Sequence, residues 1–141
     1  MSLSDVRKYF VDRCKSQGLV EWKQPFQDMD MPNTVTNKSF QVTLGEFTGV
    51  KAINNRDQEM NCPATVSIYF KGFQNPTEGV DQAVENAEKL LKECLKAKNR
   101  LGTCVKNVIL NSVLPEALSD SNDNIIRVKL GFTVFISILI D

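Results

Sequence analysis

The seventeen residues from Asn124 to Ile140 constrain the fold more than any other stretch of the chain. Every second residue there is apolar, and the residues in between are mostly polar or small. Successive side chains of a β-strand point to opposite faces, so the pattern predicts a strand with one buried face. At about 3.3 Å per residue it would run roughly 55 Å, about three times a typical strand. The apolar residues are Ile126, Val128, Leu130, Phe132, Val134, Ile136, Ile138 and Ile140.

A strand of this length has two ways to fit into a small domain. It can bend, and Gly131 is the natural place for a bend. Alternatively, it can extend beyond the sheet to which it belongs. A strand that extends beyond its sheet exposes unpaired backbone groups, which a neighbouring chain can bind.

Length and composition narrow the class of protein. A chain of 141 residues indicates one domain, spanning 1–141. The 17 basic and 17 acidic residues cancel, which argues against a dedicated nucleic-acid coat. The chain has no histidine, so it lacks the commonest general base and the commonest metal ligand.

The four cysteines have two interpretations. They lie at Cys14, Cys62, Cys94 and Cys104, without a C-x-x-C pair. A metal site or disulfides would give them a function, but we favour small buried apolar residues, which suits a reducing cytoplasm. We expect no signal peptide, and the run from Phe132 to Ile140 is too short to span a membrane.

The first part of the chain predicts a helix and a long loop. The spacing of apolar residues predicts a helix over Ser4–Gln17, capped by Ser2 or Ser4 and ended by Gly18. Leu19–Ser39 has no period, and it either packs over the core or forms an arm that a partner orders. The apolar anchors of such an arm would be Trp22, Phe26, Met29 and Met31.

A long β-hairpin is expected next. Its first strand is Phe40–Leu44, which could continue through Phe47, and its second strand is Cys62–Phe73. Pro63 is tolerated as the first residue of that second strand. Thr48–Asn61 contains the turn residues Asn54-Asn55-Arg56-Asp57 and forms an extended tip. The apolar residues of this tip have no evident core to enter. The tip is either a twisted hairpin end solvated on both sides or a subunit contact, and we favour the contact. The candidate contact residues are Val50, Lys51, Ile53, Arg56 and Met60.

The clearest helix signal follows the hairpin. Asn75, Pro76 and Glu78 suit the N-cap, N1 and N3 positions, and the apolar stripe predicts a helix from Pro76 to Lys98, closed by Gly102. Two i,i+4 ion pairs, Glu85 with Lys89 and Glu88 with Lys92, are expected on its exposed face.

A second hairpin completes the chain. It comprises a strand at Val105–Val113, a polar connection at Leu114–Asp123 and the long final strand. The resulting order, α-β-β-α-β-β, predicts an α+β two-layer domain with a mostly antiparallel sheet and helices on one face.

No motif for catalysis is present. Without histidine a Ser–His–Asp arrangement is impossible, and neither a phosphate-binding glycine loop nor a calcium loop occurs. Asp28 and Asp30 could pair as carboxylates, but in a polar loop such acids are usually solvated. We therefore expect a non-enzyme, with no catalytic, cofactor or metal site.

The order and length of these elements resemble the tail terminator (tail completion) proteins of long-tailed bacteriophages. The resemblance covers nearly the whole chain and is carried by five features rather than by a motif. They are the helix at Val6–Cys14, the loop through Trp22 and Pro32, the hairpin from Phe40 to Phe73, the helix after Asn75-Pro76, and the strand Ile125–Ile140.

The resemblance implies a structural role in the virion. Such proteins form a hexameric ring that caps the tail tube, stops its polymerisation and joins it to the head connector, and DNA passes through the lumen. Assembly would occur in the host cytoplasm. The neutral charge suits a channel that does not bind DNA tightly. Two alternatives stay open: another neck or head-tail connector subunit, or a small cytoplasmic α+β enzyme or ligand-binding domain using Cys62 or Tyr69.

Overall fold

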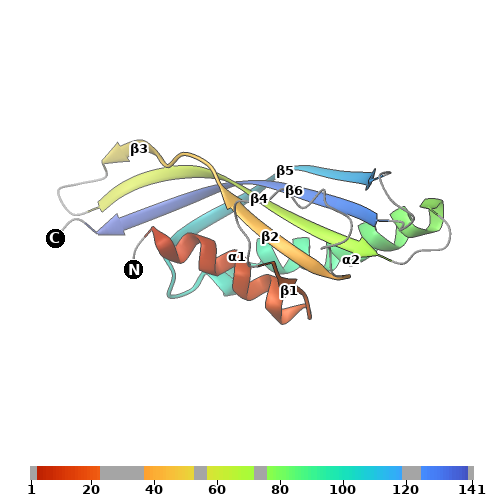
Figure 1. Cartoon of the computed structure of the whole chain (residues 1–141). Helices are drawn as coiled ribbons and strands as arrows, with labels where there is room; N and C mark the ends of the chain where they lie inside the picture. The colour runs from red at the N-terminus through yellow and green to blue at the C-terminus, as the bar shows by residue number, and fades with distance from the viewer. Residues whose placement is uncertain (1–2, 23–36, 53–56, 72–75, 119–124, 140–141) are drawn as a thin grey trace.

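A six-stranded sheet with two helices against it makes up the described part of the chain (Figure 1). The computed structural model describes residues 3–22, 37–52, 57–71, 76–118 and 125–139. The helices are α1 (Ser4–Ser16) and α2 (Pro76–Leu95), followed by the 3₁₀ turn η1 (Ala97–Arg100). The strands are β1 (Val20–Glu21), β2 (Ser39–Leu44), β3 (Thr48–Ala52), β4 (Asp57–Lys71), β5 (Val105–Leu118) and β6 (Ile125–Leu139).

The strand order is β1-β2-β4-β6-β5, and β3 pairs with β4 alongside β2. All pairs are antiparallel except β1 with β2. Figure 1 shows both helices on the same side of the curved sheet. The predicted α+β fold with a mostly antiparallel sheet is therefore confirmed.

The alternation in β6 places its apolar residues in the core, as predicted. The even-numbered residues from Ile126 to Ile136 are at most 1% exposed, and Ile138 packs against the same core. The strand does not extend beyond its neighbour, however, because β4 is equally long and pairs with β6 from Ile125 to Leu139. Of the two alternatives, the one in which the strand extends beyond its sheet is therefore wrong.

The length of β4 also corrects the predicted hairpin tip. Thr48–Asn61 is not an open tip, because β3 pairs with the first residues of β4 within it. Pro63 lies inside β4 rather than at its start. Its carbonyl accepts a hydrogen bond from the Gly45 N–H at 2.8 Å, so its backbone faces β2 and β3, and its missing N–H weakens no contact with β6.

Helix α1 covers the sheet through Val6, Phe10 and Cys14, which are fully buried. Leu3 occupies the N-cap position without a side-chain hydrogen bond, so the expected cap by Ser4 was wrong; Ser2 lies outside the described residues. Gly18 ends the helix as predicted. Its φ is +79°, and the N–H groups of Gly18 and Leu19 donate to the carbonyls of Lys15 and Cys14.

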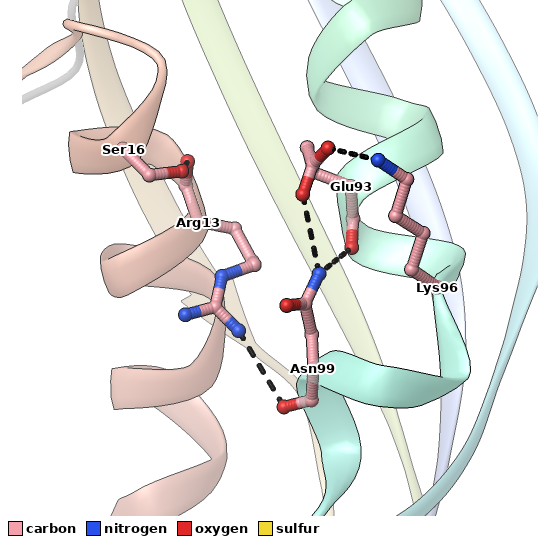
Figure 2. A network of polar contacts seen from close by, with 5 residues as sticks. All are labelled: Arg13, Ser16, Glu93, Lys96 and Asn99. Carbon is pink, nitrogen blue, oxygen red and sulfur yellow. Dashed lines mark hydrogen bonds and ion pairs between the residues drawn. The ribbon is translucent and has the colours of Figure 1, made fainter.

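Helix α2 ends at Leu95, three residues before the predicted end. Figure 2 shows the cause: the Asn99 side-chain amide donates to the Glu93 carbonyl at 2.8 Å and lies 3.3 Å from the Glu93 carboxylate. Lys96 is extended, and its ammonium binds that carboxylate. Arg13 reaches the Asn99 carbonyl across 3.5 Å (Figure 2). This cluster therefore ends α2 and links its end to α1.

The edge strand β5 is longer than predicted. It continues to Leu118, so the first half of the expected polar connection at Leu114–Asp123 is strand, and 119–124 lies outside the described residues. The register shifts between Val105 and Asn107 and between Leu110 and Ser112. Pro115 and two bulges are devices that make an edge less open to indiscriminate pairing.

Candidate subunit-contact surface

Exposed apolar side chains gather on the edge strands of the sheet. Val20 on β1 is 57% exposed and Val50 on β3 is 53% exposed. On the opposite edge, Ile109, Val113 and Leu114 of β5 are 39–49% exposed. Both edges therefore present apolar surface beside backbone that no strand among the described residues covers, a combination typical of subunit contacts.

Two of the predicted contact residues meet at the β3 end of the sheet. Val50 occupies the bulge between Gly49 and Lys51, and Met60 lies opposite Gly49 on β4. Together they line a cavity of about 70 Å³. The other lining residues are Glu59, Lys106, Phe135 and Ile136.

Trp22 lies at the other end of β4. It packs against Tyr69 and Ile125, which are both 2% exposed. Tyr69 alternates with Ile68 and Phe70 of the main core, so this small cluster is on the opposite face of the sheet. Nine residues of strand separate Met60 from Tyr69, about 30 Å. Trp22 and Met60 therefore do not form one patch, and the Trp22 ring is partly used within its own chain.

The remaining predicted contact residues are placed only in part. Lys51 lies in β3 opposite Glu59. Phe26, Met29, Met31, Ile53 and Arg56 lie outside the described residues, as do Asp28 and Asp30.

Sequence reasoning missed the apolar residues of β5. Val108, Ile109 and Leu110 are consecutive apolar residues, so a strand here places apolar side chains on both of its faces. The edge position that leaves Ile109 exposed is set by the fold. The bulge at Asn111 then shifts the alternation, so Leu114 lies opposite Lys129 on the face away from the helices.

Arg127 and Glu116 form an ion pair near that face. The Arg127 side chain is 11% exposed and that of Glu116 is 29% exposed. The hydrogen bond from the Arg127 guanidinium, at 2.5 Å, is the main cause that lowers the pKa of the Glu116 carboxyl. The pair fastens β5 to β6 beside the exposed Leu114.

All four cysteines are buried and unoxidised, as predicted. Burial raises the pKa of the Cys94 thiol to about 12 and also raises the pKa of Cys14 and Cys104. Cys62 lies 3.2 Å from the Pro63 carbonyl, and burial raises its pKa as well. Thiols that stay protonated are poor nucleophiles, so Cys62 does not favour the enzyme alternative.

We expect these thiols to resist a disulfide reagent in the native protein. A raised pKa leaves less thiolate at pH 8, and burial restricts access, so modification should be at least about a hundredfold slower than in denaturant. The check is the release of the coloured thiol from Ellman's reagent with and without guanidinium. Rapid native reaction of one thiol would show that its site opens to solvent.

The described residues hold no group of three or more acidic, cysteine or histidine side chains that could bind a metal ion. Within the same ranges, no helix is both long enough and apolar enough to cross a membrane.

The edges of the sheet, rather than a cavity with reactive groups, are thus the surface with the clearest potential for binding. Neither a scan against models of protein families nor a search of curated proteins finds a match to this chain.

Proposed function

We propose that this chain is a structural subunit that closes into a ring and acts as a phage tail terminator. The ring would cap the tail tube, stop its polymerisation and join it to the head connector. Its partners would be further copies of the chain together with the tube and connector proteins. This role needs no cofactor.

The observation that carries this proposal is the placement of exposed apolar side chains on two unlike edges of one sheet. A contact between unlike surfaces repeats from copy to copy, and it closes a ring when its rotation allows. Val50 on one edge and Ile109 on the other, each about half exposed, are suited to such a head-to-tail contact. The order and length of the elements, which resemble those of tail terminators, also support it.

The same role is consistent with the chemistry of the chain. A capping ring needs no catalytic group, and the most reactive side chain type present, the cysteine thiol, is buried in each case. The formal net charge of zero suits a lumen through which DNA moves without specific binding. The ring would be assembled in the host cytoplasm and retained in the virion.

The test is the mass of the purified protein by light scattering, followed by electron micrographs of the large species. Closed rings, six copies each, are the expected result. A protein that stays monomeric at every concentration, and forms no ring when tail tubes are added, would contradict the proposal.

Charge placed on either edge should weaken the assembly. Burying a valine or isoleucine side chain contributes about 1.5–3 kcal/mol, so Val50→Asp and Ile109→Asp should each weaken subunit association by about tenfold or more. The measurement is the concentration dependence of mass, with circular dichroism to show that the variants remain folded.

Gln82→Asp is the control. Gln82 is an exposed residue of α2 outside both edges of the sheet, and aspartate there should leave assembly unchanged. If all three variants assemble like the wild type, the edges are not the contact surface.

A further inference from the structure

A cavity of about 200 Å³ lies between the two helices and the sheet. Its floor is formed by Ile68 and Phe70 of β4, which are at most 2% exposed. Its walls come from the end of α1, the start of β2 and the middle of α2. The wall residues are Gln17, Leu19, Lys38, Asn86 and Lys89.

The charged side chains described around this cavity are all positive. Among the residues that the structure describes, Lys38 and Lys89 are the only charged ones that line it, in a chain whose basic and acidic residues cancel. Of the two ion pairs expected on α2, Glu88 with Lys92 forms at 3.4 Å, but the structure gives no pair between Glu85 and Lys89. Lys89 lines the cavity instead, so its charge is available to a ligand there.

Lys38 provides an independent observation. Among the described residues it is the only one other than glycine with a positive φ, at 59°. Its N–H donates to the Tyr69 carbonyl and its carbonyl accepts from the Val20 N–H, so β1 and β4 hold this conformation in place. Glycine would adopt it at lower cost, and a lysine here instead places a cation at the cavity.

The end of α1 offers little opposition to an anion. The carbonyl groups at a helix C-terminus carry partial negative charge. Here, however, the carbonyls of Lys15 and Cys14 already accept hydrogen bonds from Gly18 and Leu19. The polar side chains beside them, Gln17 and Asn86, can donate to a carboxylate.

We propose that this cavity binds a small carboxylate with one aromatic ring or one short branched chain. The apolar part would lie against Leu19, above the almost fully covered Ile68 and Phe70. The carboxylate would lie between Lys38 and Lys89. The volume is appropriate, because a cavity of about 150 Å³ accepts a benzene ring. This inference is independent of the proposed ring, which needs no ligand.

Phenylacetate is the probe, and saturation-transfer difference NMR is the measurement, because it works on a monomer or a ring alike. We expect binding in the millimolar range for so small a ligand, weakened by added salt. The neutral analogue phenylacetamide should bind at least about fivefold more weakly, since it cannot use the two lysines.

Three variants locate the site. Lys89→Gln and Lys38→Gly should each weaken phenylacetate binding by about fivefold, and glycine keeps the backbone of position 38. Asn86→Phe should abolish binding by filling the cavity. Lys92→Gln is the matched control, an exposed lysine on the same helix outside the cavity, and should bind like the wild type.

The proposal is overturned if phenylacetamide binds as well as phenylacetate, or if Lys89→Gln and Asn86→Phe retain wild-type affinity. Either result would be obtained whether or not the protein forms rings, so it leaves the proposed function untouched.

Discussion

Replacing Phe132 by alanine should lower the free energy of unfolding by about 3–5 kcal/mol, the largest effect expected of any single truncation here. Phe132 lies near the middle of β6 and is 1% exposed. Its ring centroid is 5.3 Å from that of Phe10, which is fully buried, so one side chain holds α1 on the sheet. Denaturant unfolding followed by circular dichroism measures the change.

Phe135→Ala is the control on the same strand. Phe135 is only half-buried and points to the opposite face, so its truncation should cost about 1–2 kcal/mol. The double variant Phe10→Ala with Phe132→Ala should be less destabilised than the sum, because the two rings share one contact. Equal effects at Phe132 and Phe135 would mean that the assigned core face is wrong.

Replacing Gly45 by alanine should destabilise the fold by about 1–3 kcal/mol, although one methyl group is added at an exposed position. A Cβ at Gly45 would lie 2.4 Å from Cγ and 3.2 Å from Cδ of Pro63. The proline ring is rigid, and its carbonyl holds the Gly45 N–H at 2.8 Å, so neither group can move without loss of that hydrogen bond.

Gly49→Ala is the matched control, because its added Cβ would meet only the Gln58 side-chain nitrogen, at 3.6 Å. It should be neutral, or stabilising by a few tenths of a kcal/mol. Pro63→Ala should remove most of the penalty at position 45. If Gly45→Ala is as harmless as Gly49→Ala, the close packing of Pro63 on Gly45 does not exist in solution.

The sequence predicts the elements whose signal is local and repeated. The alternation of β6 and the stripe of α2 each identify an element, its type and its buried face, because burial selects one face at every period. Gly18 also marked its helix end correctly, since the signal is the conformation of a single residue.

The elements and boundaries that the sequence did not predict depend on tertiary contacts. Thr48–Ala52 has no alternation, and it becomes β3 only because β4 offers it an edge. Pro115 falls in the predicted polar connection but lies within β5, because an edge strand tolerates proline on its open side. The end of α2 depends on the Asn99 side chain, six residues after the carbonyl it binds.

Of the candidate contact residues, some could likewise be predicted from the sequence and others depend on the fold. Val50 and Met60 could be selected because apolar residues beside turn residues lack a core to enter. Ile109 and Leu114 could not, since their exposure depends on β5 being the outermost strand and on a bulge. The cavity of Lys38 and Lys89 is lined by four separate segments, and only the folded chain brings them together.

The position of β6 between β4 and β5 has a consequence for how the chain folds. β4 and β6 pair over their full length, yet α2, η1 and β5 separate them in sequence. Until β6 is in place, one long edge of β4 stays open, and α2 lacks part of the sheet that it covers. Contacts between residues so far apart close slowly, so we expect folding in milliseconds to seconds as one cooperative step.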